Sequence, residues 1–196
     1  MKNNDVMLPF NERLKIGIPR EGDFGNYLQD NFMIFKHNEI PSIEELPPSQ
    51  ERDDLIRNNL IYGDFELYTP YGRFFIDVKN SYNLYERSIN NFTIDGYYAL
   101  VPERQCEIED GWVVRSRSLK AYYRKMKEHK SKYIRTAYEP NRLCATHYIQ
   151  FKPNNFYCKI KVSEFIRLAD TSKARHEFES KIDEVFIANK KKMNGR

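Results

Sequence analysis

The chain has 196 residues, of which 40% are hydrophobic and 31% charged, and its formal net charge is +4. This length suits one domain with a sizeable core, while the lack of any apolar stretch of about 18 residues argues against a membrane span. The amino terminus lacks the apolar core of a secretory signal, and Cys106, Cys144 and Cys158 are too scattered for a disulfide framework. We therefore predict an intracellular, cytoplasmic protein.

The first 48 residues show weak patterning. Residues 1–20 contain two prolines and little periodicity, so we expect them to be loosely structured. Residues 23–37 carry aromatic and aliphatic side chains near helical spacing. A linker with several prolines follows from Pro41 to Pro48.

A helix is predicted after this linker. Ser49 has a side chain typical of an N-cap, and Gly63 marks the end of the pattern. Leu55, Ile56 and Leu60 are expected to face inward. The helix therefore leads straight into the segment Gly63–Lys79.

The segment Gly63–Lys79 predicts a β-hairpin. Its turn is Thr69-Pro70-Tyr71-Gly72, in which Pro and Gly occupy positions that favour a tight turn. Because side chains alternate across a strand, Asp77 and Lys79 share one face. Every second residue from Asp64 shares a face on the first strand, and the hairpin brings that row beside Asp77. We therefore expect carboxylates and one ammonium group to converge.

Such a convergence suits phosphate chemistry. Mg²⁺ prefers near-octahedral oxygen ligands and is commonly held by one or two carboxylates together with water and substrate phosphate. Asp64 and Asp77 would supply these oxygens. A neighbouring lysine, here Lys79, would orient the attacking water or stabilise the developing charge.

The hairpin resembles the PD-(D/E)xK nuclease superfamily, which includes restriction endonucleases and junction resolvases. By this resemblance Asp64 is the first acid, Asp77 the second and Lys79 the lysine, and Val78 lends its backbone carbonyl to the metal. Gly63 stands where the motif name has proline. The resemblance implies a restriction-endonuclease-like core, ordered α-β-β-β-α-β, and cleavage of DNA with Mg²⁺ or Mn²⁺. RNA as the substrate and a homodimer stay open as alternatives.

The resemblance also implies an acid on the leading helix. Glu51, four residues before Leu55, is the first candidate, and Glu44 and Glu45 are its rivals. Glu51 is equally explained as a first-turn acid favoured by the helix dipole.

Three elements are predicted after the hairpin. Asn80–Asn91 has helical spacing and would form the crossover helix. Residues 97–101 are apolar enough for a buried strand that pairs parallel to the second hairpin strand. Residues 112–114 predict a further short strand.

The carboxyl-terminal part predicts a second hairpin and a helix. Residues 144–152 and 156–162 would pair across a turn at 153–155, and a helix would follow over 163–189. The basic tail 190–196 is expected to be disordered. We thus predict a single α/β domain, with a mixed central sheet flanked by helices, a core at about 49–162 and a helical extension.

A basic helix lies between these parts. Leu119, Tyr122, Tyr123 and Met126 form an apolar stripe, and four basic residues lie off it. This arrangement is typical of a solvated helix face, and it equally suits contact with a DNA backbone. The candidate nucleic-acid contacts are Lys120, Arg124, Lys127 and Lys130.

Some of these residues have other interpretations. Asp77 and Lys79 could form an ordinary cross-strand charge pair on an exposed hairpin. Cys144 and His147 have a spacing found in zinc sites, but on one strand they would point to opposite faces. No glycine-rich phosphate loop occurs. The leading hypothesis is a Mg²⁺-dependent DNA endonuclease, and the alternative is a non-catalytic module that binds nucleic acid or protein.

Overall fold

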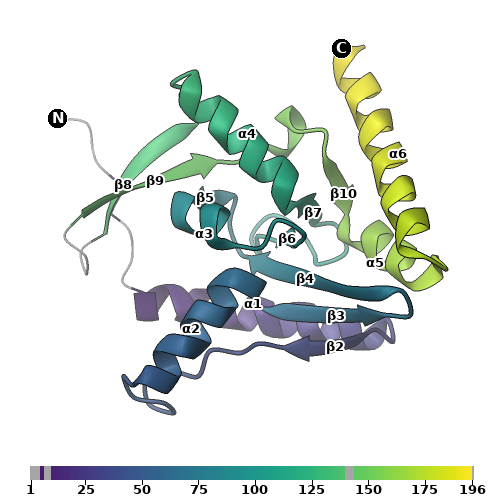
Figure 1. Ribbon diagram of the computed structural model, residues 1–196. Helices are drawn as coiled ribbons and strands as arrows, with labels where there is room; N and C mark the ends of the chain where they lie inside the picture. The colour runs from purple at the N-terminus through teal and green to yellow at the C-terminus, as the bar shows by residue number, and fades with distance from the viewer. Residues whose placement is uncertain (1–4, 7–9, 140–143, 196) are drawn as a thin grey trace.

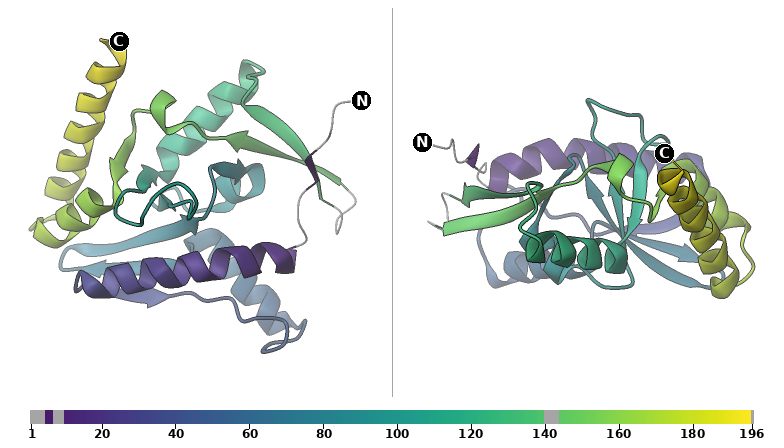
Figure 2. Two further views of the ribbon diagram at one scale, coloured as in Figure 1. Left: turned by 180° about the vertical axis from the view of Figure 1, so that it is seen from behind. Right: turned by 90° about the horizontal axis from the view of Figure 1, so that it is seen from above.

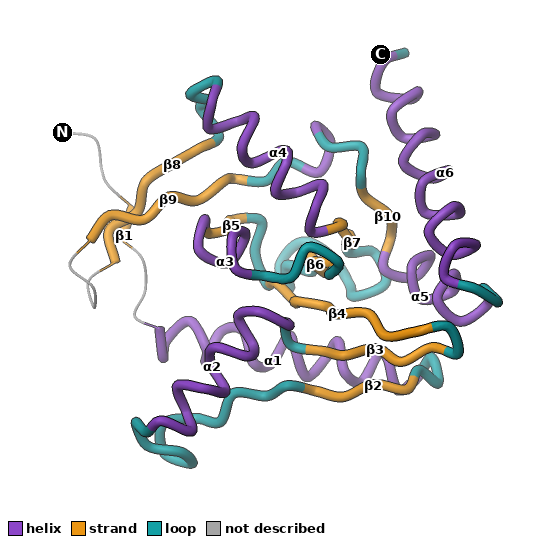
Figure 3. Tube along the Cα trace, viewed as in Figure 1, coloured by secondary structure: helices purple, strands orange, loops and turns teal. Residues whose placement is uncertain are grey.

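The computed structural model describes residues 5–6, 10–139 and 144–195. A six-stranded sheet with the order β10-β7-β6-β4-β3-β2 forms the centre of the molecule (Figures 1 and 3). Only β4 and β6 pair in parallel within it, and the other neighbours are antiparallel. The predicted α/β class with a mixed central sheet is therefore confirmed. Its strands are β2 (Ile34–His37), β3 (Phe65–Thr69), β4 (Gly72–Lys79), β6 (Tyr97–Leu100), β7 (Trp112–Arg115) and β10 (Lys159–Lys161).

Helices cover both faces of this sheet (Figures 1 and 2). The side chains of Ile76 and Val78 pack in a core with α1, α5 and α6, whereas Tyr98 and Leu100 pack in a second core with α3 and α4. Because Asp77 alternates with Ile76 and Val78, it faces the second layer. The helices are α1 (Phe10–Asp30), α2 (Gln50–Tyr62), α3 (Glu86–Asn91), α4 (Ser116–Glu128), α5 (Val162–Thr171) and α6 (Arg175–Asn194).

A second, four-stranded sheet has the order β1-β8-β9-β5. Ile149 on β9 packs with Leu119 and Tyr123 of α4, so this sheet lies against the second helical layer. Its pairing of β8 with β9 forms a long antiparallel arm beside α4 (Figure 1). Its strands are β1 (Asp5–Val6), β5 (Asn83–Tyr85), β8 (Ile134–Glu139) and β9 (Cys144–Gln150).

The start and end of α2 agree with the sequence prediction. The Ser49 side chain accepts a hydrogen bond from the Arg52 N–H, as an N-cap does. Gly63 ends the helix with φ of 76°, a left-handed conformation that glycine adopts at little cost. A Cβ atom there would lie 2.6 Å from the Ile76 carbonyl oxygen, so helix and hairpin approach each other closely.

The predicted hairpin is also confirmed. β3 and β4 pair antiparallel, with Phe65 opposite Ile76 and Thr69 opposite Gly72. The same register places Asp64, one residue before β3, opposite Asp77. The parallel strand expected at 97–101 is β6, and the short strand at 112–114 is β7.

The predictions for the first 37 residues were confirmed only in part: residues 23–30 are helical as their spacing indicated, but the other segments differ. Residues 10–20 belong to α1 despite the internal Pro19. The helix is held by burial of Phe24 and Leu28 and by Arg20, which donates hydrogen bonds to the carbonyls of Val101 and Cys106. Residues 34–37 form β2 rather than continuing a helix.

Three predictions for residues after the first hairpin were also wrong in part. Within Asn80–Asn91, residues 83–85 form β5 and only 86–91 are helical. The expected hairpin of 144–152 with 156–162 does not form, because β9 pairs with β8 while β10 joins β7 in the central sheet. The carboxyl-terminal helix is split into α5 and α6, and α6 continues to Asn194 through the tail expected to be disordered.

Candidate functional site

Asp64 lies between the end of α2 and the start of β3. Its side chain is buried, with 3% of the residue exposed. Oδ2 accepts the backbone N–H of Val78 at 2.6 Å, and Oδ1 accepts Nδ2 of Asn59 at 2.9 Å. The left-handed Gly63 and the two donors therefore fix this carboxylate against the end of β4.

Asp77 and Lys79 lie two positions apart on β4 and form an ion pair. Nζ of Lys79 lies 2.8 Å from Oδ1 of Asp77, and the exposed fraction is 30% for the Lys79 side chain and 6% for that of Asp77. The other oxygen, Oδ2 of Asp77, is buried and has no hydrogen-bond partner among the described residues. A buried carboxylate oxygen without a donor is costly, so this atom marks a position where a cation or donor would stabilise the site.

The electrostatics of the three groups reflect their burial. Burial raises the pKa of Asp64 well above its usual value, and the nearby Asp77 and Glu21 raise it further. Burial also raises the pKa of Asp77, with Lys79 opposing the rise. For Lys79, burial lowers the pKa, but the carboxylates of Asp77 and Asp64 outweigh it and the net shift is upward. The lysine is therefore held as a cation while the carboxylates repel each other.

A third carboxylate, Glu21, approaches this group from α1. It adds to the upward shift of the pKa of Asp64 and Asp77, so its charge lies near both. The neighbouring Arg20 donates to the carbonyl of Val101, just after β6, and so anchors Glu21 near the carboxyl ends of β4 and β6. Nε2 of His37 lies 3.9 Å from Oε2 of Glu21.

The acids proposed from the sequence for the leading helix lie elsewhere. Glu51 is exposed in the first turn of α2, and Asp64 follows the opposite end of that helix. Eleven residues of helix separate Glu51 from Tyr62, which is about 16 Å. Glu44 is exposed, and Glu45 accepts the backbone N–H of Ser42 at 2.8 Å in a local turn. The structure thus places Glu21, and not Glu51, near the pair of aspartates.

Sequence reasoning missed Glu21, Asn59 and His37. Asn59 lies near the end of a correctly predicted helix, where its side chain could have been expected to reach Asp64 five residues later. Glu21 and His37 lie in α1 and β2, which the sequence pattern did not predict. No local signal linked them to a hairpin that begins 26 residues or more further along the chain.

The donor set suits a hard cation held partly by water. Among the described residues no group of three or more His, Cys, Asp or Glu side chains has the spacing of a complete metal site. Asp64 and Asp77 offer two carboxylates, and the unpartnered Oδ2 of Asp77 is free to bind. Mg²⁺ commonly takes this number of protein ligands and keeps several waters, so the residues fit this ion.

Glu66 shares the face of Asp64 but belongs to a different cluster. Its carboxylate lies 3.1 Å from Nη1 of Arg73 and 3.6 Å from Nζ of Lys36. Tyr68 donates a hydrogen bond to it. Glu66 is therefore a buried but neutralised acid.

The basic helix α4 packs as the stripe predicted. Leu119 and Tyr123 are buried, and Tyr122 and Met126 are partly buried beside them. The four candidate nucleic-acid contacts divide into two pairs. Lys120 donates to the carbonyls of Asn90 and Phe92, and Lys127 forms a 2.6 Å ion pair with Glu86. Arg124 and Lys130 are exposed.

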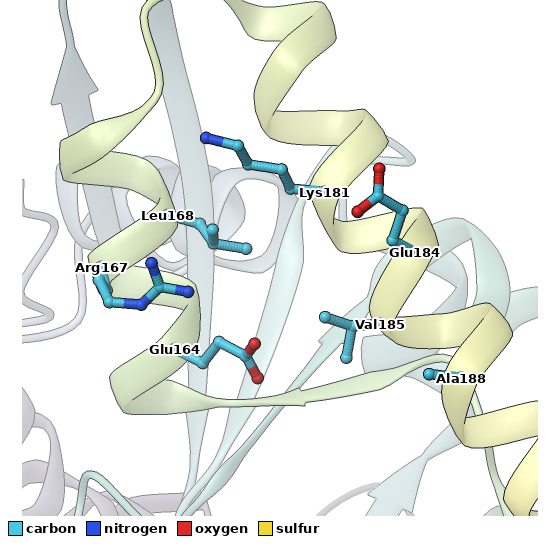
Figure 4. Close-up of a pocket in the computed structure, with 7 residues that line it drawn as sticks. All are labelled: Glu164, Arg167, Leu168, Lys181, Glu184, Val185 and Ala188. Atoms are coloured by element: carbon cyan, nitrogen blue, oxygen red, sulfur yellow. The ribbon is translucent and has the colours of Figure 1, made fainter.

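A hollow between α5 and α6 is separate from the aspartates (Figure 4). Glu164 and Arg167 of α5 face Val185 of α6 across it. Its helices cover the opposite face of the sheet from Asp77. It therefore adds nothing to this site.

His147, the residue considered for zinc, pairs with a carboxylate. Its Nδ1 lies 3.4 Å from Oε2 of Glu86. The side chain of Cys144 lies outside the described part of the chain.

Comparisons with known proteins add no relative. No protein-family model, curated protein or solved structure matches this chain. In the described ranges, no helix has the length and apolar character needed to cross a bilayer. The candidate function therefore depends on the geometry of Asp64, Asp77 and Lys79.

Proposed function

We propose that the protein is a Mg²⁺-dependent nuclease that hydrolyses phosphodiester bonds, with DNA as its substrate and endonucleolytic cleavage as its mode. One observation carries this proposal: two buried carboxylates meet beside a cationic lysine, and one carboxylate oxygen has no partner in the described residues. Purely structural acids are normally neutralised, as Glu66 is by Arg73 and Lys36. An unsatisfied pair is costly unless a ligand completes it.

The order of elements supports a restriction-endonuclease-like core. α1, β2, β3, β4, α3 and β6 follow one another as α-β-β-β-α-β, interrupted by α2 and the short β5. β2, β3 and β4 form an antiparallel meander, and β6 lies parallel to β4. In this alignment α1 is the leading helix and Glu21 its acid, while α2 is an insertion. The proposed core therefore begins at α1 rather than at residue 49.

Each residue has a role in the proposed reaction. Asp64 and Asp77 would hold Mg²⁺, or Mn²⁺ in its place, and Val78 would add its backbone carbonyl. The ion would supply charge for the phosphoryl oxygens and lower the pKa of an attacking water. Lys79, kept cationic by its two carboxylate neighbours, orients that water and stabilises the charge that develops on phosphorus. Asn59 and the N–H of Val78 hold Asp64 in place.

A non-catalytic nucleic-acid-binding module is the second candidate. It is favoured by the 2.8 Å ion pair between Lys79 and Asp77, which would also be formed if both groups were structural. In that case the protein would bind DNA without cutting it. The two candidates therefore differ in a single observable, the broken phosphodiester bond.

A cleavage assay distinguishes them. Supercoiled plasmid, linear duplex and branched DNA, with single-stranded RNA for comparison, are incubated with Mg²⁺, Mn²⁺ or a chelator. We expect cleavage of DNA with either metal and none with the chelator. Asp77→Ala should remove activity, while Glu66→Gln, an equally buried acid on the same hairpin, should retain most of it. Binding without cleavage under every metal would overturn the nuclease proposal.

A further inference from the structure

Some basic side chains of the described chain have a carboxylate partner and others do not, and one run of basic residues without such a partner lies on α4 and the start of β8. Ion pairs of 4.0 Å or less neutralise lysines and arginines on the hairpin and on α2, α4, α6 and β10. Among the described residues of α4, Lys127 alone forms such a pair. Five exposed basic residues between positions 124 and 135 have no carboxylate partner in the described chain: Arg124, Lys125, Lys130, Lys132 and Arg135. We call these five residues the α4–β8 tip.

The tip differs from the set that sequence alone suggested. Lys120 donates to two carbonyls at the end of α3, and Lys127 pairs with Glu86 at the start of α3. Both lysines therefore fasten α4 to α3 and have fewer free N–H donors to offer a ligand. The only acid within the tip is Glu128, which is exposed.

Helix stability explains only part of the tip. Cations near a helix carboxyl terminus interact favourably with the helix dipole, which accounts for Lys125 in the last turn of α4. The effect fades within one turn, so it does not account for Lys132 or for Arg135 on β8. Lys130 has φ of 47°, a conformation that glycine adopts at lower cost. Folding alone therefore does not call for a lysine at this position.

We infer that the α4–β8 tip is a docking surface for the phosphate backbone of DNA. The inference rests on the proposed function for its choice of ligand. Uncompensated Lys and Arg side chains neutralise phosphates and release counterions, which supplies most sequence-independent affinity. Lys130, Lys132 and Arg135 follow Glu128, the last residue of α4, so this part of the tip lies beyond the end of the helix.

Binding is measured by fluorescence anisotropy with labelled duplex DNA in the presence of a chelator, so that cleavage plays no part. The test variant carries Lys125→Ala, Lys130→Gly and Lys132→Ala, and glycine at 130 keeps the left-handed turn. The control variant carries Lys190→Ala, Lys191→Ala and Lys192→Ala, which removes the same charge from exposed positions at the end of α6. Thermal unfolding of both variants checks that each is folded.

We expect the test variant to lower the slope of log affinity against log salt by about 2 to 3, since each lost phosphate contact removes about 0.9 for duplex DNA. The control variant should change the slope of log affinity against log salt little. Equal effects of the two variants, or no DNA binding by the unmodified protein, would overturn the inference. If the unmodified protein cleaves DNA but the test variant has an unaltered salt slope, the docking role of the tip is rejected and the nuclease proposal stands. If the test variant has a lowered salt slope but the unmodified protein cleaves no DNA, the nuclease proposal is rejected and the docking role stands.

Discussion

The carboxylate of Asp64 accepts the backbone N–H of Val78 at 2.6 Å, which brings the first acid of the site against the strand that carries the second. Asp77 precedes Val78 on that strand, and its side chain faces the same layer. Two acids that lie 13 positions apart in the sequence thus become neighbours. Burial raises the pKa of both acids, and Asp77 raises the pKa of Asp64 further, which leads to the first prediction.

The metal-free protein should lose stability at this site as the pH rises. The pKa of Asp64 and of Asp77 is raised in the folded state. Each group therefore stabilises the folded protein at a pH below its unfolded-state pKa of about 3.9. This stabilisation is lost as the pH rises through the folded-state pKa. Asp77→Asn removes one buried charge and should raise stability by about 0.5–2 kcal/mol near neutral pH. Thermal melts in chelator should show this gain shrinking towards pH 4, and a gain independent of pH would contradict the account.

Mg²⁺ should reverse this instability. A ligand at a hundred times its dissociation constant stabilises a protein by about 2.7 kcal/mol. We expect Mg²⁺ or Mn²⁺ to raise the melting temperature of the unmodified protein and not that of Asp77→Asn. Electron paramagnetic resonance of Mn²⁺ reports the binding directly. Equal Mn²⁺ binding by both proteins would place the ion elsewhere.

Glu21 and Glu51 provide a matched pair of variants. Glu21→Gln removes a charge that acts on both aspartates, so we expect weaker Mn²⁺ binding and a higher Mg²⁺ requirement for cleavage. Glu51→Gln changes an exposed first-turn acid and should alter neither Mn²⁺ binding nor the Mg²⁺ requirement. It should cost about 0.3–1 kcal/mol of stability, because the acid interacts favourably with the helix dipole. Weaker Mn²⁺ binding by Glu51→Gln, with unchanged binding by Glu21→Gln, would instead support Glu51 as the acid of the leading helix.

The sequence predicted the hairpin because its information is local. The turn at 69–72 and the alternation of apolar with charged residues on β4 determine both register and face. α2 was predicted for the same reason, since Ser49 and Gly63 act on their own neighbours. Asp64, Asp77 and Lys79 could therefore be placed together without a structure.

Several pairings between distant segments were not predicted, although the parallel pairing of β6 with β4 was. β9 and β10 look like two arms of a hairpin, but β10 pairs with Trp112–Val114 and β9 with β8. Ile34 is 72% exposed on β2, so no alternation of buried and exposed apolar residues marks it as a strand. Because α1 and β2 were not recognised, the helix acid was sought in the nearest predicted helix, and Glu51 was chosen in place of Glu21.

The close approach at Gly63 should be essential to the position of Asp64. Gly63→Ala puts a side chain on a residue with φ of 76° and a Cβ atom 2.6 Å from the Ile76 carbonyl oxygen. We expect a loss of about 2–4 kcal/mol, from backbone strain and the contact together. Gly22→Ala, in the middle of α1 with no atom within 4 Å of its Cβ position, should instead gain about 0.5–1 kcal/mol. Urea titrations compare the two, and a Gly63→Ala protein as stable as the original would contradict this packing.

We propose that Lys79, together with Asp64 and Asp77, performs metal-dependent hydrolysis. The most direct measurement compares plasmid cleavage by the unmodified protein, by Lys79→Ala and by Lys161→Ala with Mg²⁺ present. Lys161 is a half-exposed lysine that pairs with Asp110 on the β10 side of the sheet. The account predicts that Lys79→Ala remains folded and loses at least about a hundredfold in rate, while Lys161→Ala retains its activity. Undiminished cleavage by folded Lys79→Ala would contradict it.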